Sequence, residues 1–166
     1  RHAYSNPGYV LAGHLIEVLA QQPYSTYIKE QILNPLGMRA SGFHFKQPAG
    51  PFAQGYDGAL QPAKYVSIQG GPAGDLCANA QDMTRFLQFL LQRNGKLIDS
   101  IAFDEAAFDR IENAQTTLAA RNGLPGGHGL GNFSVYQKGH VFHGHNGAIE
   151  GFSARYIYSR TADLGI

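Results

Sequence analysis

The sequence has little cysteine, little excess of charge and no long apolar run. Cys77 is the one cysteine among 166 residues, which excludes an internal disulfide and a zinc site built on cysteines. The 13 basic and 12 acidic residues are scattered and leave a formal net charge of +1, so we expect no nucleic-acid partner. No apolar run approaches the roughly 20 residues that cross a bilayer. With 43% hydrophobic residues, the chain can still build the core of one globular domain.

Helical spacing of apolar residues dominates the first two thirds of the chain. Asn6 before Pro7 is typical of a helix start, and Ser25 and Asn79 are the predicted N-caps of two later helices. Pro35 ends the second of these helices. The predicted helices cover about residues 7–21, 25–34, 80–94 and 104–113.

The last third of the sequence is predicted to form short strands. Runs at 130–136, 140–145 and 152–158 are separated by turn residues at 137–139 and 147–151, the pattern of an antiparallel meander. Residues 161–166 read as a turn and the opening of a further strand, and residues 42–71 as loops with short strands.

We therefore predict one α+β domain, an antiparallel sheet flanked by helices, with a helical part over about 1–125 and strands over about 126–166. A strong helix start follows Arg1 within a few residues, and the last residues open a strand. We expect the domain to be incomplete at both ends.

Tyr4, Ser5 and Asn6 form a polar triplet immediately before the first predicted helix. In an extended segment the phenol of Tyr4 and the amide of Asn6 point the same way. A tyrosine there can relay a proton, and an asparagine can donate to a substrate carbonyl. The alternative is structural, with Asn6 capping the helix and Tyr4 packing as an ordinary aromatic.

A second group of polar residues lies in the strand region around His143, His145 and Gly147. Gly147 permits close approach of a backbone, and the N–H of Ala148 after it could face a developing oxyanion. His143 and His145 would share one strand face, so a metal pair is conceivable, but further ligands at suitable spacing are lacking. The glycine-rich run 126–131 lacks the strand-loop-helix context of a phosphate-binding loop.

Several motifs occur in the order typical of one enzyme family. Tyr4-Ser5-Asn6 before a helix resembles the Tyr-x-Asn element of the serine β-lactamase and penicillin-binding protein superfamily, which includes D-alanyl-D-carboxypeptidases and related esterases. The further matches are Asn34-Pro35-Leu36-Gly37-Met38, Pro72-Ala73-Gly74-Asp75-Leu76, Gly129-Leu130-Gly131 and His145-Asn146-Gly147.

The resemblance implies a β-lactamase/DD-peptidase-like fold and a serine hydrolase that forms an acyl-enzyme on an amide, lactam or ester carbonyl. It implies that Tyr4 relays the proton, that Asn6 orients the scissile amide, and that His145 takes the place often held by lysine beside the substrate carboxylate. Gly147 and the N–H of Ala148 would belong to the oxyanion hole. The resemblance implies no cofactor and no metal, a small-molecule or peptide substrate, and a periplasmic or secreted location.

The sequence departs from the family pattern at two places. No serine is followed three residues later by lysine, so the Ser-x-x-Lys nucleophile is expected upstream of Arg1, and this segment alone should not form the acyl-enzyme. His145 stands where class C β-lactamases typically have lysine, which resembles the peptidase-like and esterase-like relatives. An imidazole attracts a carboxylate less strongly than an ammonium, so efficient β-lactam hydrolysis is not expected.

Two other readings stay open at this point. The scaffold could persist as a binding module without catalysis, which the sequence upstream of Arg1 would decide. A metallohydrolase built on His140, His143 and His145 is the third possibility, with zinc content as its test.

Overall fold

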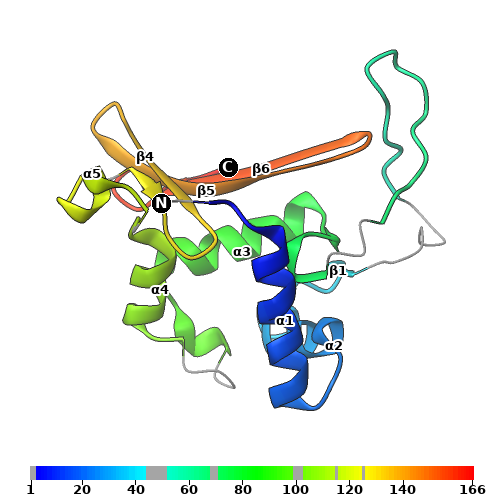
Figure 1. The fold of residues 1–166 in the computed structure, drawn as a ribbon, viewed down its shortest axis with the longest axis horizontal. Helices are drawn as coiled ribbons and strands as arrows, with labels where there is room; N and C mark the ends of the chain where they lie inside the picture. Colours follow the sequence, from blue (N-terminus) through cyan, green and yellow to red (C-terminus); the bar gives the residue numbers. More distant parts are fainter. Residues whose placement is uncertain (1–2, 44–51, 68–70, 99–102, 115, 125) are drawn as a thin grey trace.

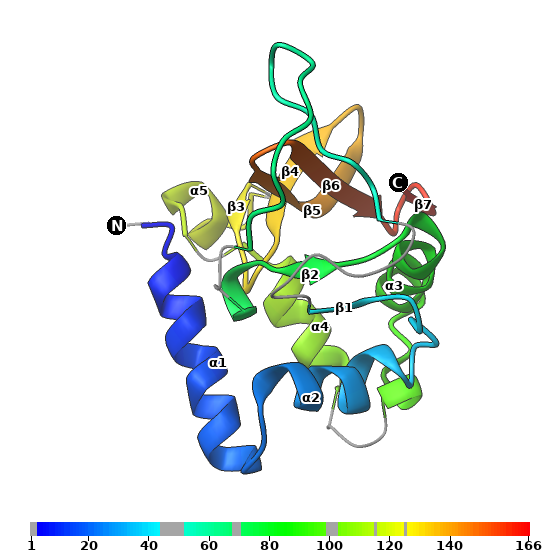
Figure 2. The ribbon, with the colours of Figure 1, turned by 90° about the vertical axis from the view of Figure 1, so that its right-hand side faces the viewer.

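A computed structural model describes residues 3–43, 52–67, 71–98, 103–114, 116–124 and 126–166. It confirms the predicted α+β class. A five-stranded antiparallel sheet has the order β3-β4-β5-β6-β7, and α3 and α4 lie against one of its faces (Figures 1 and 2). A small two-stranded sheet, β1-β2, lies among the helices.

Most of the helical elements precede the five strands of the main sheet along the chain. The helical elements are α1 (Asn6–Ala20), α2 (Tyr24–Ile28), the π-helix η1 (Lys29–Leu33), the 3-10 helix η2 (Gly71–Ala73), α3 (Ala80–Gln92), the 3-10 helix η3 (Gly95–Ile98), α4 (Glu105–Glu112) and α5 (Leu118–Arg121). The strands are β1 (Gly42–Phe43), β2 (Leu76–Cys77), β3 (Gly127–His128), β4 (Phe133–Gln137), β5 (His140–Ile149), β6 (Phe152–Ser159) and β7 (Leu164–Gly165). Residues 44–51 and 68–70 of the predicted loop segment lie outside the described residues.

The predicted helices are present, but two of the predicted caps are wrong. Asn79 does cap α3, since its side chain accepts from the N–H of Asp82 at 2.8 Å. At α1 the cap is Ser5, whose hydroxyl accepts from Gly8, and Asn6 is the first helical residue. Ser25 lies inside α2, where the carboxylate of Glu17 accepts from the first N–H of the helix at 2.9 Å. A distant carboxylate has replaced the local cap.

The strands differ from the prediction at two boundaries. The predicted strand 130–136 begins only at Phe133, because Leu130 donates its N–H to Arg110 and Gly131 has a φ of 90°. The predicted break at Gly147 is also wrong. β5 continues to Ile149 because a two-residue turn at 150–151 is enough to join it to β6. The further strand expected in 161–166 is present as β7, which pairs with β6.

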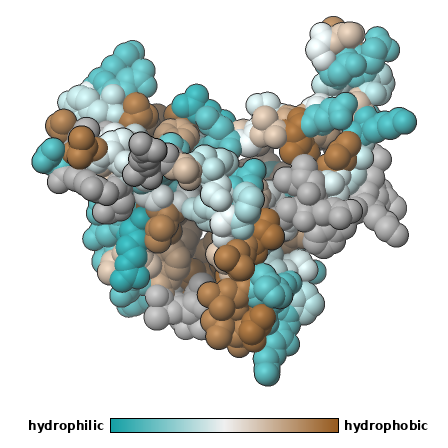
Figure 3. Space-filling model, viewed as in Figure 1, coloured by the Kyte–Doolittle hydropathy of each residue, from teal (hydrophilic) through white to brown (hydrophobic). Residues whose placement is uncertain are grey.

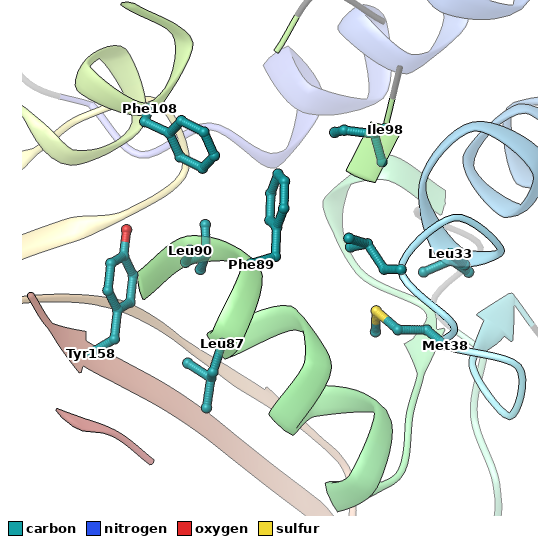
Figure 4. Packing of buried hydrophobic residues seen from close by; sticks show 9 residues of the cluster. Leu33, Met38, Leu87, Phe89, Leu90, Ile98, Phe108 and Tyr158 are labelled. Carbon is teal, nitrogen blue, oxygen red and sulfur yellow. The ribbon is translucent and has the colours of Figure 1, made fainter. Parts of the chain in front are cut away.

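The hydrophobic core lies between α3 and the surrounding elements. Leu87 and Leu90 of α3 pack among residues of β6 and α4, including Tyr158 and Phe108, both of which are almost fully buried (Figure 4). The segment after η1 adds Met38 on the other side of the helix. α3 therefore connects the sheet to the helical part, and the core fixes their relative positions.

The apolar face of α1 is only partly covered by the rest of the chain. Gly13 is the one buried residue of this helix, and a side chain there would clash with Pro72. Leu11, Leu15 and Leu19 remain 68%, 55% and 75% exposed, and apolar surface gathers over this region in Figure 3. None of the helices in the described ranges is long and apolar enough to cross a membrane.

Candidate active site

Tyr4 and His145 meet although 141 positions separate them in the sequence. The phenol oxygen of Tyr4 lies 3.4 Å from Nε2 of His145, and the two rings stack with centroids 6.1 Å apart. Tyr4 comes from the segment before α1 and His145 from the middle of β5, so the contact joins the helical part to the sheet. A phenol and an imidazole at this distance can share or pass a proton.

The start of α1 leaves two polar groups available at this contact. Because Ser5 supplies the cap, the exposed amide of Asn6 has no hydrogen-bond partner within the described part of the chain. Tyr4 is 61% exposed. The phenol and the carboxamide are therefore free to contact a molecule bound beside His145, although Asn6 itself does not contact the ring of His145 within hydrogen-bonding distance.

The edge of β5 that faces away from β6 has unpaired backbone groups. Ile157 of β6 exchanges two backbone hydrogen bonds with Ile166, so its partner on β5, Gly144, directs its own N–H and C=O away from β6. This alternation repeats every two residues, which directs the N–H of Ala148 to that same edge. β4 covers the edge only as far as Phe133, opposite Gly144. The N–H of Ala148 therefore lacks a strand partner among the residues described.

Gly147 borders an open space rather than a packed one. A Cβ on Gly147 would meet no atom within 4 Å, and its φ is not in the left-handed region. Because residues two apart on a strand share a face, Gly147 lies on the side of β5 that carries His145. The glycine is therefore required neither by turn geometry nor by internal packing, and the space beside it is available to a ligand.

The other two histidines of this strand are engaged elsewhere. Ser134 donates its hydroxyl to the carbonyl of Glu112 at 2.7 Å, so its oxygen accepts from Nδ1–H of His143 at 2.8 Å. His140 contacts Thr161 instead. The three histidines thus have three different partners, and no group of three metal-ligating side chains occurs within the described residues. A zinc site on His140, His143 and His145 has no support in this geometry.

Burial acts on the charge state of His143. Desolvation lowers the pKa of this imidazole, while the charge of Glu112 opposes the shift. His143 is therefore held neutral with its proton on Nδ1, which suits a structural role.

A buried series of hydrogen bonds next to the site was not predicted from the sequence. Tyr156 donates its hydroxyl to Asn132 at 2.6 Å, Asn132 donates to Tyr158 at 3.2 Å, and Tyr158 donates to Glu112 at 3.1 Å. Arg93 forms a salt bridge with the same Glu112 carboxylate. Burial is the largest cause that raises the pKa of Tyr156 to about 12, so its phenol stays protonated. A polar residue directly after a glycine-rich turn was the only local signal for Asn132.

Two hollows in the surface lie away from the Tyr4–His145 contact. One of about 510 Å³ lies between α2, η1 and residues 39–43, and one of about 300 Å³ lies between α4, α5 and Ser134. The space at Tyr4 and His145 is open to solvent, so convergence of polar groups, rather than depth, identifies it as the candidate site.

Comparison with known families assigns the chain to one of them. The sequence model of the Beta-lactamase family matches residues 1–166. This chain belongs to the Beta-lactamase family.

This Beta-lactamase family member is similar to proteins with several different names. The chain is 34% identical over 110 residues to Beta-lactamase-like protein 2 of Dictyostelium discoideum, a match that covers 62% of this chain and 20% of that protein. The octameric penicillin-binding protein homologue of Pyrococcus abyssi superposes with a TM-score of 0.80 at 24% identity, covering 99% of this chain and 37% of that one. The D-stereospecific amidohydrolase of a Streptomyces species gives a TM-score of 0.77 at 25% identity, covering 98% and 48%. The family member described here thus spans a fifth to a half of these proteins.

Proposed function

We propose that this chain forms part of a serine hydrolase that attacks an amide, lactam or ester carbonyl and passes through an acyl-enzyme. The observation that carries the proposal is the 3.4 Å contact between Tyr4 and His145. The amide of Asn6, two residues after Tyr4, and the N–H of Ala148, three residues after His145, have no partner within the described residues. Membership of the Beta-lactamase family and the likeness to a D-stereospecific amidohydrolase support this class of reaction.

In this proposal each group has a defined role. Tyr4 relays the proton: its phenol passes its own proton to Nε2 of His145 as it takes the proton of the attacking serine hydroxyl, and the reverse transfers protonate the leaving group. Asn6 donates a hydrogen bond to the substrate amide, and His145 holds the phenol and lies beside the substrate carboxylate. The N–H of Ala148 donates to the oxyanion as the tetrahedral intermediate forms, and Gly147 leaves room for the substrate.

The serine itself comes from a segment that this chain does not contain, because none of its serines has a lysine three residues later. His145 in place of a lysine favours D-amino-acid amides and esters that carry no free carboxylate over β-lactams, since an imidazole holds a carboxylate less tightly than an ammonium.

Mass spectrometry of a longer protein that contains this chain tests the proposal. After exposure to a fluorophosphonate, we expect one covalent adduct on a serine of a Ser-x-x-Lys sequence, and none on residues 1–166. A panel of D-amino-acid amides, D-amino-acid esters and penicillins then ranks the substrates.

The other readings predict different results. An inactive binding module gives no adduct but retains saturable binding of a D-amino-acid peptide. A metallohydrolase gives no adduct, and its activity is lost on chelation and restored by zinc. Either result would refute the acyl-enzyme.

A further inference from the structure

We propose that Asn132 is a positioning residue for the Tyr4–His145 site, acting through Tyr156. Asn132 touches neither of the two site residues, and it lies in the turn between β3 and β4 with 1% of its surface exposed. The inference rests on the proposed function for its kinetic consequence, but its structural consequence can be measured without catalysis.

The carboxamide of Asn132 both accepts and donates a hydrogen bond. Its oxygen accepts from Tyr156 at 2.6 Å, and its NH₂ group donates to Tyr158 at 3.2 Å. Tyr158 can then donate to Glu112, which is 4% exposed and forms a salt bridge with Arg93. A carboxamide carries both a donor and an acceptor, so asparagine satisfies both phenols at once. This chain of bonds anchors β6 to the ends of α3 and α4.

Tyr156 transmits this anchoring to His145. The two residues are direct partners across β5 and β6, and such partners place their side chains on the same face with Cβ atoms about 5 Å apart. The ring of Tyr156 also packs edge-on against Phe86 of α3, with centroids 5.7 Å apart. The phenol is thus held at both its ring and its oxygen, and it supports the part of β5 that carries His145.

The same turn lies close to the helix that follows Tyr4. The hydroxyl of Tyr9 on α1 lies 3.9 Å from the position of a Cβ on Gly131. Gly131 is directly bonded to Asn132, and it has a φ of 90° that few other residues adopt. The turn over residues 129–132 therefore contacts both β6, through Tyr156, and α1, through Tyr9, and α1 is the helix that follows Tyr4.

An apolar side chain at this position would fill the space but leave the tyrosine hydroxyls without this partner. Buried polar groups move to regain hydrogen bonds, because an unpaired one is costly. Asn132→Leu is thus expected to shift Tyr156 and, with it, the ring of His145. Tyr156→Phe is the milder second variant, because it keeps the ring packing against Phe86 and removes only the hydroxyl.

The kinetic test uses the longer enzyme and a double-mutant cycle. Asn132→Leu is expected to lower kcat/KM about 10- to 100-fold, the scale of a displacement near 1 Å. In the Tyr4→Phe background, Asn132→Leu should lower kcat/KM less than about threefold, because the position of His145 relative to the Tyr4 hydroxyl no longer matters. Asn122→Leu, an exposed asparagine on the surface after α5, is the matched control and should leave kcat/KM unchanged.

A second readout is independent of activity. In the ¹⁵N spectrum of the histidine rings of the same enzyme, Tyr4→Phe should shift the His145 signals when Asn132 is present, and should shift them far less in Asn132→Leu or Tyr156→Phe. Loss of this response with normal folding supports the proposal even if no acyl-enzyme forms. Equal shifts in both backgrounds, or an equal kinetic cost in both, would overturn it.

Discussion

His143 and His145 show how two histidines on one strand acquire different roles. Both lie in β5, but His145 meets the exposed phenol of Tyr4, whereas His143 donates to Ser134 and packs against Tyr158 at 5.5 Å between ring centroids. Burial lowers the pKa of His143 and keeps it neutral. Their spacing of two residues on a strand predicted a common face for the two rings, and their partners distinguish them.

The depressed pKa of His143 predicts a direction for the pH dependence of stability. Below about pH 6.5, the ordinary value for histidine, the unfolded chain binds a proton that the folded chain resists, so the free energy of unfolding should fall as pH is lowered. Urea denaturation at pH 7.5 and 5.5 measures this. The difference between the two pH values should shrink in His143→Asn. An unchanged difference in His143→Asn would contradict the assignment.

At the scale of elements, the strand pair β5-β6 contains two glycines with opposite surroundings. A Cβ on Gly144 would clash with the carbonyl oxygen of Tyr156 and crowd Ile157, whereas a Cβ on Gly147 would meet nothing within 4 Å. The first glycine is required by the pairing of the strands. The second borders the space assigned to the substrate.

These glycines give a matched pair of variants. Gly144→Ala should lower the free energy of unfolding by about 1–3 kcal/mol, because backbone atoms must move apart. Gly147→Ala should change it by less than about 0.5 kcal/mol but lower kcat/KM of the longer enzyme about tenfold or more, because the methyl group occupies the substrate space. Thermal or urea denaturation and steady-state kinetics separate the two effects. A stability loss in Gly147→Ala would contradict the open site.

Local signals predicted some elements well and others poorly. α3 was predictable because Asn79 caps it and its apolar stripe follows the helical period, both of which are local. The start of β4 was not, because it depends on the long-range bond from Leu130 to Arg110. The cap of α1 was misassigned because Ser5 and Asn6 are adjacent and both are good caps, so only the three-dimensional position of each side chain distinguishes them.

At the scale of the whole molecule, the apolar face of α1 is exposed to a degree that is unusual for a globular surface. The helix was predicted from its apolar spacing, but Leu11, Leu15 and Leu19 stay more than half exposed. The sequence pattern showed that a face exists and could not show what contacts it. Contiguous apolar patches of this kind favour association.

The chain purified alone as residues 1–166 is therefore expected to self-associate through this face. Sedimentation velocity should show species larger than a monomer, and Leu15→Gln with Leu19→Gln should return the chain toward the monomer. Leu60→Gln is the control, since Leu60 is 79% exposed in a different segment. A monomeric chain at high concentration would show that the face of α1 does not drive association.

The Tyr4–His145 contact could be anticipated from the order of motifs, but its geometry could not. Tyr-x-Asn and His-x-Gly predicted two polar groups, and the fold places the phenol oxygen of Tyr4 3.4 Å from Nε2 of His145. Asn132 and Tyr156, which we propose support the contact, were not identified from the sequence. Their hydrogen bond joins segments 24 residues apart, which no local pattern encodes.

The most direct test of the whole account is the single-turnover rate of acylation of the longer enzyme by an activated D-amino-acid ester, compared between the unmodified protein and Tyr4→Phe. If Tyr4 relays the proton as proposed, loss of its hydroxyl is expected to slow acylation about 10²- to 10⁴-fold while substrate binding is retained. Tyr136→Phe, which removes an exposed phenol from β4, should acylate at the unmodified rate. Equal acylation rates for the unmodified enzyme and Tyr4→Phe would contradict the assignment of this site.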